Sequence, residues 1–373
     1  MKRKSFLILT ASIGSGHTKA AQAIKEALLK QQPSDIVNIV DWSDKRVSPA
    51  NWLTKKLYLK MLAFVPNLYD VFYKLSANGL GGAMAQQTNE RLMYRTMQRV
   101  LSEFSPDAVI CTHPFPAGAA AAVKRRGGKF LSATVLTDYT LHKMWVYNET
   151  DIFFTATEQM RSELIQMGFA PNRIVASGIP IREAFMAQDT KENVRGKMGI
   201  ADEEKVILLM GGGLGLGGIE NTVAALERIE QQLTMFVIAG RNERLKERML
   251  KKADTSAHTL RVLGYIKDIA PYMRAADLII TKPGALTVSE SFALGLPMIL
   301  HEPIPGPETQ NARHAVDNGA ALWAGKDIER VVGETIADAS RLQAMQKAAL
   351  ELSRPNAAAE IAEKLRREIV RYR

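Results

Sequence analysis

The sequence is short of the residues that build disulfide frameworks and metal centres. Its 373 residues include one cysteine, Cys111, which excludes an internal disulfide and fits a reducing cytosol. Because Val109 and Ile110 precede it, we expect Cys111 to be a packed strand residue and not a nucleophile. The six histidines are scattered along the chain. No metal-ligand cluster stands out, and we expect neither a metal nor another cofactor.

Long apolar runs are also missing. A membrane-spanning helix needs roughly 20 consecutive apolar residues, and no stretch approaches that length. The basic and then apolar start of the chain resembles a signal peptide, but its apolar run is short and leads into a glycine loop. We therefore interpret it as a first buried strand. Zinc-ligand spacings and RNP-like aromatic strands are absent too, which argues against a nucleic-acid partner.

Positive charge is what the chain has in excess. Its 49 lysines and arginines outnumber 39 aspartates and glutamates, which gives a net charge of +10. Such a balance suggests an anionic partner. In the absence of a nucleic-acid motif, phosphorylated substrates and lipid headgroups are the better candidates.

Strand and helix patterns alternate along the chain, and the same order of predicted elements occurs twice. Each half opens with an apolar run, a glycine loop and a helix pattern: residues 5–10 run into 11–17, and residues 205–210 run into 211–218. This repetition predicts an α/β fold with parallel sheets, arranged as two doubly wound domains with a cleft between them. A chain of 373 residues is long enough for two cores.

We place the first domain at residues 1–180 and the second at 181–355, followed by a charged amphipathic helix at 356–373, which we expect to pack back toward the first domain.

Residues 42–99 form an insertion that interrupts the alternation of strand and helix patterns. The insertion interleaves aromatic and basic side chains, among them Trp52, Lys55, Lys56 and Tyr58. A basic amphipathic helix with aromatics can lie in a membrane interface. The pattern alone slightly favours a stripe packed on the first domain, with solvated lysines.

In the first half, polar side chains follow three predicted strands. His17 ends the glycine loop just ahead of a helix, His113 follows the strand that holds Cys111, and Asp138 follows the strand 132–137. The carboxyl ends of parallel strands meet at one edge of a sheet, so these residues suggest a site. Histidine has the right pKa for a general base near neutral pH. From position alone, two roles for His17 are equally supported: a general base, or a residue that caps the helix or supports a neighbouring site residue.

The second half offers a nucleotide-like pattern. Residues 213–218 read Gly-x-Gly-x-x-Gly between a strand and a helix, which suits a pyrophosphate. The acidic residue that a dinucleotide site wants about 20 residues later is missing, and a tight turn without ligand competes with this interpretation. Further on, Glu290 can accept hydrogen bonds from a ribose diol, Glu308 and Asn311 from sugar hydroxyls, and Arg182 can pair with a phosphate. Each of them can equally be a surface or capping residue.

Several motifs together resemble glycosyltransferase family 28. Its donor-site signature is similar to Lys282-Pro-Gly-Ala-Leu-Thr-Val-Ser-Glu290, Gly295-Leu-Pro297 and Pro305-Gly-Pro-Glu-Thr-Gln-Asn311. One branch of the family is matched by Gly14-Ser-Gly-His17, Thr137-Asp-Tyr139, Gly178-Ile-Pro-Ile-Arg182 and Gly264-Tyr-Ile266. That branch contains the monogalactosyldiacylglycerol synthases and the processive diacylglycerol glucosyltransferases. The resemblance covers nearly the whole chain, and the motifs occur in the family's order.

The resemblance implies a GT-B architecture, with two Rossmann-like domains facing across the active-site cleft. It implies a hexosyltransferase that moves a hexose, with inversion and without a metal, from UDP-glucose or UDP-galactose to diacylglycerol or a glycosyl-diacylglycerol. The first domain would receive the lipid, so the insertion 42–99 becomes a candidate for lipid docking. The implied location is cytoplasmic, peripherally bound to the anionic inner face of the cell membrane.

Residue roles follow from the same resemblance. His17 would be the catalytic base. Asp138 would be a further catalytic residue that lines the acceptor side, together with Gly16, His113, Trp52, Lys55, Lys56 and Tyr58. The donor site would be formed by Arg182, Gly212, Gly213, Tyr265, Ile266, Thr287, Ser289, Glu290, Glu308 and Asn311. Within it, Glu290 would hold the ribose, the backbone of Tyr265 and Ile266 the uracil, Arg182 with the glycine loop the diphosphate, and Glu308 and Asn311 the sugar.

One position departs from the family pattern. Pro307 stands where relatives usually carry glutamine, so a side chain expected near the donor sugar is missing and the choice between glucose and galactose stays open. Two other functions also remain open. One is a transferase for another lipid or polyprenyl acceptor, similar to the peptidoglycan N-acetylglucosaminyltransferase. The other is a non-catalytic UDP-sugar sensor.

Overall fold

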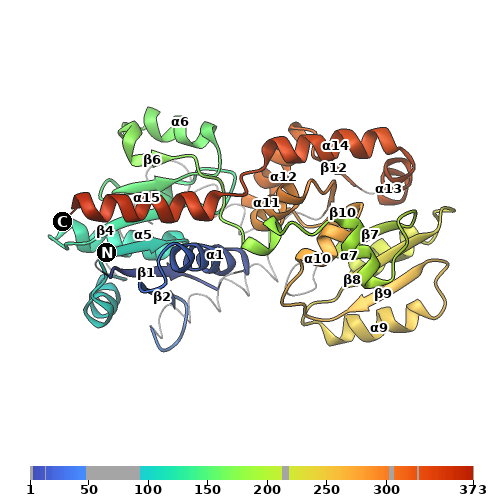
Figure 1. Ribbon diagram of the computed structural model, residues 1–373, viewed down its shortest axis with the longest axis horizontal. Helices are drawn as coiled ribbons and strands as arrows, with labels where there is room; N and C mark the ends of the chain where they lie inside the picture. Colours follow the sequence, from blue (N-terminus) through green and yellow to red (C-terminus); the bar gives the residue numbers. More distant parts are fainter. Residues whose placement is uncertain are drawn as a thin grey trace. The chain divides into compact units, whose positions relative to one another are not determined.

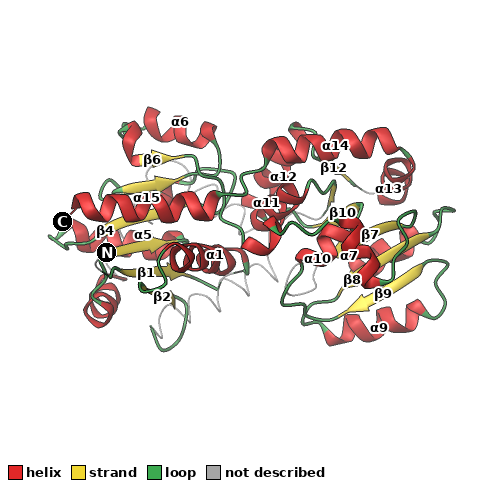
Figure 2. Cartoon of the chain, viewed as in Figure 1, coloured by secondary structure: helices red, strands yellow, loops and turns green. Residues whose placement is uncertain are grey.

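The computed structural model describes residues 3–12, 14–47, 93–211, 218–301, 306–325 and 327–372. The chain divides into two compact units (Figure 1). Unit 1 comprises Met1–Glu183, Ile304–Pro307 and Arg354–Arg373, and unit 2 comprises Ala184–Pro303 and Glu308–Ser353. Each unit is an α/β layer structure around its own sheet (Figure 2).

Unit 1 is built on a six-stranded sheet in which all strands are parallel, with the order β2-β1-β3-β4-β5-β6. The strands are β1 (Ser5–Thr10), β2 (Ile36–Asp41), β3 (Ala108–Cys111), β4 (Leu131–Val135), β5 (Ile152–Phe154) and β6 (Ile174–Val175). Cys111 is buried at the end of β3, which confirms that it is a packed strand residue.

Helices cover both faces of this sheet. They are α1 (Gly16–Gln31), α5 (Pro114–Arg125), α6 (Glu158–Gln166) and α15 (Ala357–Tyr372), with residues 93–104 also helical and short 3-10 turns at η1 (Lys143–Trp145) and η2 (Pro171–Arg173). Strand β1 shows the alternation expected of a strand with two buried faces. Phe6 and Ile8 pack with α1 and α15, whereas Leu7 and Leu9 pack with α5 and the helix at 93–104.

The C-terminal helix α15 packs on α1 and belongs to unit 1. Its Arg366 forms an ion pair with Asp35, whose side chain is fully buried and also accepts the backbone N–H of Lys4 at 3.0 Å. The turn ahead of the helix fits closely against Gly178. A Cβ atom added at Gly178 would lie 2.4 Å from Cβ of Arg354.

Unit 2 repeats the plan with a second parallel six-stranded sheet, ordered β12-β11-β10-β7-β8-β9. Its strands are β7 (Lys205–Met210), β8 (Leu233–Ile238), β9 (Thr259–Leu263), β10 (Leu278–Thr281), β11 (Met298–Leu300) and β12 (Ala321–Trp323). Its helices are α7 (Lys191–Met198), α8 (Ile219–Leu226), α9 (Glu243–Ala253), α10 (Ala270–Ala275), α11 (Ala285–Leu294), α12 (Pro307–Asp317), α13 (Ile328–Ala337) and α14 (Ala339–Leu352), with a 3-10 turn at η3 (Glu183–Met186).

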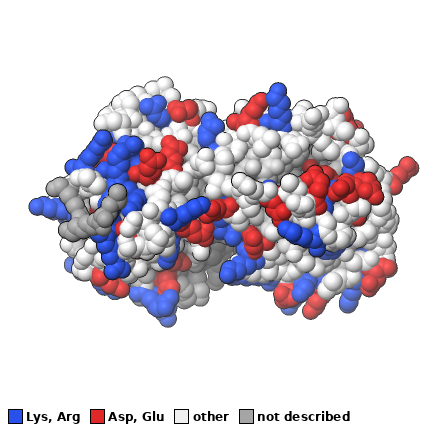
Figure 3. Space-filling view, viewed as in Figure 1, with Lys and Arg blue, Asp and Glu red and all other residues white. Residues whose placement is uncertain are grey.

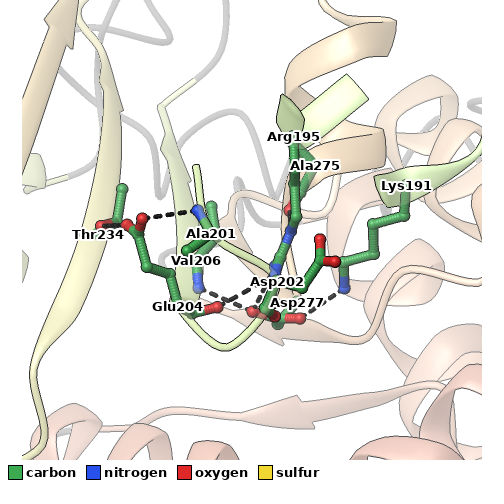
Figure 4. A network of polar contacts seen from close by, with 9 residues as sticks. All are labelled: Lys191, Arg195, Ala201, Asp202, Glu204, Val206, Thr234, Ala275 and Asp277. Carbon is green, nitrogen blue, oxygen red and sulfur yellow. Dashed lines mark hydrogen bonds and ion pairs between the residues drawn. The ribbon is translucent and has the colours of Figure 1, made fainter. Parts of the chain in front are cut away.

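A polar network closes the amino-terminal edge of the unit 2 sheet (Figure 4). Asp277, just before β10, accepts hydrogen bonds from Lys191 at 2.5 Å, from Arg195 at 2.8 Å and from the backbone N–H of Val206 at 2.7 Å. The buried guanidinium of Arg195 also donates to the carbonyls of Ala275, Asp202 and Glu204. This network therefore ties helix α7 to strands β7 and β10.

Two local expectations were wrong. His17 lies inside the first turn of α1 and not ahead of the helix, because α1 begins at Gly16. The prolines and the glycine at 303–307 predict a polar loop that continues to Glu308 and Asn311, but both residues lie on helix α12. Proline is well suited to a first helical position, since its missing N–H would have no partner there, and Pro307 is the first residue of α12.

In the part of the chain that is described, no helix is both long and apolar enough to cross a membrane.

Candidate active site

The histidine motifs of unit 1 lie at the point where the order of its sheet reverses. From β1 the chain moves outward to β2 and then returns to β3 on the other side of β1. The loops that follow β1 and β3 therefore diverge, and such a switch point is where open α/β sheets bind ligands. The loop after β1 leads to His17, and the one after β3 contains His113. The sequence prediction that these residues meet at one edge is confirmed by contact between their rings.

His17 is held from two neighbouring strand ends. Its ring Nδ1 lies 2.7 Å from Oγ1 of Thr137, which follows β4. Its backbone carbonyl accepts a hydrogen bond of 3.1 Å from Oγ1 of Thr112, which follows β3. Both threonines are buried, whereas His17 is only partly buried. The ring is thus fixed in orientation by these contacts.

Opposing effects set the protonation of His17. Burial lowers its pKa below the ordinary value of 6.5, while the negative charge of Asp138 and a backbone hydrogen bond with Thr112 raise it in part. The net pKa is lowered, so the imidazole is mostly neutral at neutral pH and can accept a proton. Asp138 lies three residues past the end of β4, because this strand ends at Val135 and not at residue 137.

His113 is the N-cap of α5 and lies edge to face with His17, with their ring centroids 4.7 Å apart. Trp145 borders both rings, with centroids 6.2 Å from His17 and 6.4 Å from His113. Burial and the neighbouring His17 hold the pKa of His113 well below its ordinary value. The two histidines therefore have different environments within one corner of unit 1.

The glycine loop before His17 is anchored by Asp41, which the sequence did not single out. The carboxylate of Asp41, at the end of β2, accepts from the hydroxyl and the backbone N–H of Ser12 at 2.5 and 3.1 Å, and from the hydroxyl of Ser43 at 2.6 Å. Burial alone would raise the pKa of Asp41, but these hydrogen bonds lower it. An acidic residue at a strand end next to the glycine loop was the available signal. Trp145 and Thr112 were missed as well, and nothing local in the sequence marks them.

Unit 2 has its own switch point, between β7 and β10. The glycine segment 211–218 follows β7, and the turn Lys282–Gly284 follows β10. Oγ1 of Thr281 donates to the carbonyl of Met210 at 2.8 Å, so the two strand ends are joined directly. The two motifs predicted to bind a nucleotide therefore begin side by side.

Helix α11 starts from the Lys282–Gly284 turn and carries three predicted donor residues. Glu290 is buried, with 1% of its surface exposed. The hydroxyl of Ser289 donates to the carbonyl of Ala285 in the same helix at 2.8 Å, which is a structural role. Thr287 is partly buried.

The remaining donor residues occupy other strand ends. Tyr265 and Ile266 follow β9, and the Tyr265 side chain is 58% exposed, with the Arg241 guanidinium 4.9 Å from its ring centre. Glu308 lies in the first turn of α12, after β11, and Asn311 is buried one turn later. Arg182, between β6 and η3, is partly buried in unit 1.

Six predicted residues lie outside the described part of the chain: Trp52, Lys55, Lys56, Tyr58, Gly212 and Gly213. Gly16 is the first residue of α1, next to His17. Among the described residues, no group of three histidine, cysteine or acidic side chains is arranged to hold a metal ion.

Comparisons with known proteins cover both units. Residues 17–181 match the family model of monogalactosyldiacylglycerol (MGDG) synthase, and residues 206–365 match the C-terminal domain of glycosyltransferase family 28. A processive diacylglycerol beta-glucosyltransferase of Bacillus cytotoxicus is 32% identical over 97% of this chain and 93% of its own length. The Bacillus subtilis protein of the same name is 31% identical over 98% and 95%.

Solved structures show the same fold. The Acinetobacter baumannii MurG structure superposes with a TM-score of 0.61 at 18% identity, covering 98% of this chain and 100% of that one. Anabaena Alr3699/HepE, solved with UDP and glucose, gives 0.55 at 14% identity, covering 98% and 100%. The two parallel sheets in one chain are thus those of the GT-B glycosyltransferases. The chain belongs to glycosyltransferase family 28, in the branch of the monogalactosyldiacylglycerol synthases and processive diacylglycerol glucosyltransferases, and is a lipid glycosyltransferase.

Proposed function

We propose that this enzyme transfers a hexose, with inversion, from UDP-glucose or UDP-galactose to diacylglycerol or a glycosyl-diacylglycerol at a membrane surface. The observation that carries the proposal is the setting of His17, a mostly neutral imidazole held by Thr137 at the switch point of unit 1. The names of the relatives favour glucose as the transferred hexose. Their beta products also favour inversion, because the hexose of a UDP-sugar is α-linked.

The chemistry needs one proton acceptor and one stabilised leaving group. His17 removes the proton of the acceptor hydroxyl, and the oxygen attacks C1 of the hexose. The bond between C1 and the diphosphate oxygen breaks, and UDP leaves with the electron pair. Asp138 supports this step because its negative charge stabilises the imidazolium form of His17.

The donor is assigned to the strand ends of unit 2, with Arg182 added for the diphosphate. Glu290 would bind the ribose hydroxyls, the backbone at Tyr265 and Ile266 the uracil, and Glu308 and Asn311 the hexose. Arg182 and the backbone at Gly212 and Gly213 would stabilise the charge that develops on UDP. Because cationic and backbone groups can supply this stabilisation, we expect transfer to persist in EDTA.

The membrane assignment is supported by the distribution of charge. The residues of unit 1 include 29 lysines and arginines against 17 aspartates and glutamates, a net charge of +12, whereas unit 2 has 20 against 22, a net charge of −2. On the face drawn in Figure 3, lysine and arginine side chains gather at the end of unit 1 where α15 finishes. Basic residues near an anionic membrane contribute about 1 kcal/mol each. We propose peripheral binding of unit 1 to the inner face of the cell membrane, with the insertion 42–99 taking part.

The experiment is transfer to vesicles that contain diacylglycerol, with a panel of UDP-sugars and mass spectrometry of the extracted lipids. We expect a hexosyl-diacylglycerol from UDP-glucose or UDP-galactose, and none from UDP-N-acetylglucosamine. Vesicles with a polyprenyl phosphate acceptor serve as the comparison. Product only on the polyprenyl lipid would move the enzyme to another acceptor class, and no lipid product from any donor would refute the proposal. Vesicle sedimentation at low and high salt tests the membrane step separately.

A further inference from the structure

His113 has a fixed hydrogen-bonding direction that distinguishes it from His17. As the N-cap of α5, its Nδ1 accepts a hydrogen bond of 3.3 Å from the backbone N–H of Phe115. A backbone N–H can only donate, so Nδ1 must carry a lone pair. In a neutral imidazole with an unprotonated Nδ1, the proton is on Nε2. The cap therefore selects the Nε2–H form of His113.

Protonation of His113 is opposed from two sides. A second proton could only go to Nδ1, where it would face the N–H of Phe115 and break the cap. The residue is 6% exposed, and burial together with the neighbouring His17 keeps its pKa well below the ordinary value. His113 is thus a poor base, although it lies beside one.

The Nε2–H group of His113 is available to donate a hydrogen bond to a ligand. The described ring neighbours of His113 are His17, Phe115 and Trp145, and no described residue accepts a hydrogen bond from Nε2. Nε2 is not among the buried described side-chain atoms that lack a partner, so this N–H keeps contact with solvent, and a ligand oxygen can take the place of water as its acceptor. Its contact with His17, at a centroid distance of 4.7 Å, puts such an oxygen next to the atom that loses a proton to His17.

We propose that His113 is a permanently neutral hydrogen-bond donor for the lipid acceptor, binding through Nε2–H an oxygen adjacent to the reacting hydroxyl. In diacylglycerol that oxygen is the neighbouring ester carbonyl, and in a glycosyl-diacylglycerol it is an adjacent sugar oxygen. The assignment of the ligand rests on the proposed function. The hydrogen bond orients the hydroxyl toward His17 without taking its proton, so one histidine positions the acceptor and the other removes the proton.

The first test reads the tautomer and does not depend on activity. In protein labelled with nitrogen-15 at histidine, with His113→Gln used for assignment, the spectra of His113 should show the neutral Nε2–H form from about pH 5.5 to about pH 9. A proton on Nδ1 of His113, or its titration there, would overturn the proposal even if the enzyme used another acceptor.

The second test is kinetic. In His113→Asn, the asparagine side chain keeps a cap acceptor for the N–H of Phe115 but is too short to place an N–H group where Nε2–H lies. We therefore expect kcat/KM for the lipid to fall about tenfold, which corresponds to the loss of one hydrogen bond. The KM for the UDP-sugar should be unchanged. His142 is the matched control, because its Nδ1 caps η1 by accepting from Met144 N at 3.2 Å. His142→Asn should leave kcat/KM for the lipid near wild type. An unchanged lipid kcat/KM in His113→Asn, or an equal loss in His142→Asn, would show that His113 only caps its helix.

Discussion

Nδ1 of His17 lies 2.7 Å from Oγ1 of Thr137, and the two residues are 120 positions apart in the chain. The hydroxyl can accept from Nδ1–H, and in that arrangement Nε2 keeps the lone pair that a general base needs. Thr137 would therefore act on the reaction through His17, by holding its ring and its tautomer. With this hydrogen bond, Nε2 of His17, in the first turn of α1, is the ring atom that would accept the proton.

Replacement of Thr137 by valine tests this role. Valine preserves the shape of threonine but has no hydroxyl, so we expect kcat to fall about tenfold, whereas Thr137→Ser should retain most of the activity. Thr134→Val, at a buried position in β4 of the same sheet, is the control for packing. The measurement is the steady-state rate at saturating substrates. Equal activity of Thr137→Val and wild type would show that the hydroxyl does not orient His17.

The rate should depend on pH through His17. The neutral form is the active base, so kcat/KM is lost as the pH falls through the pKa of this residue. Because burial lowers that pKa, the acid limb should have its midpoint below 6.5. Asp138 raises the pKa of His17 by its charge, so Asp138→Asn should move the acid limb to still lower pH. An acid limb that stays in place or moves upward in Asp138→Asn would contradict the electrostatic coupling.

The network around Asp277 should matter for stability and not for chemistry. Asp277→Asn leaves the buried cation of Arg195 without its counter-charge, and breaking a buried pair costs about 3 kcal/mol. Burial alone would raise the pKa of Asp277, but Lys191, the N–H of Val206 and Arg195 lower it overall. The contribution of Asp277 to the free energy of unfolding is therefore fully present above the pKa that its carboxyl has in the unfolded chain. It is lost as the pH falls through the lower pKa of the folded state. Urea unfolding provides the measurement.

Lys191→Met is the matched comparison in this network. The Lys191 side chain is 36% exposed against 4% for Arg195, so its loss should cost about 1 kcal/mol or less. The KM for the UDP-sugar should stay near wild type in both variants. A cost for Lys191→Met as large as that for Asp277→Asn would show that Arg195 is not the partner that needs the charge.

The sequence was most informative where the structure is local or follows from parallel strands. Glycine loops and polar strand ends indicated which residues would meet at a candidate ligand site, because parallel strands bring their carboxyl ends to one edge. Thus His17, His113 and the Lys282–Gly284 turn could be assigned to sheet edges before any contact was known. What could not be predicted is the tertiary contact, such as that between Thr137 and His17, since no periodicity records it.

The ends of helices could not be predicted from the sequence for the same reason. The pattern after β7 extends a helix to residue 231, but α8 ends at Leu226. There the carbonyl of Leu226 lies 2.9 Å from Nε2 of His258, and the next side chain, Glu227, bonds Ser256 at 2.5 Å. These tertiary partners satisfy the end of the helix in place of another turn. A window of sequence around 219–231 contains neither of them.

Gly178 provides a last prediction, on the attachment of α15. It has a φ of +89°, which a side chain rarely adopts, and a Cβ atom there would also collide with Arg354. Gly199, the C-terminal cap of α7, has a φ of +63° and nothing within 4 Å of such a Cβ. Gly199→Ala therefore measures the backbone cost alone, about 1 kcal/mol.

Gly178→Ala should cost more than Gly199→Ala, because the turn at Arg354 must move and the helix that begins at Ala357 follows it. Hydrogen exchange should then speed up along α15 and at the amide of Lys4, which is bonded to Asp35, the partner of Arg366. Exchange in unit 2 should stay unchanged in this variant. Equal unfolding free energies for the two glycine variants, with α15 still protected, would mean that the contact between Gly178 and Arg354 adjusts at no cost and does not hold the helix on unit 1.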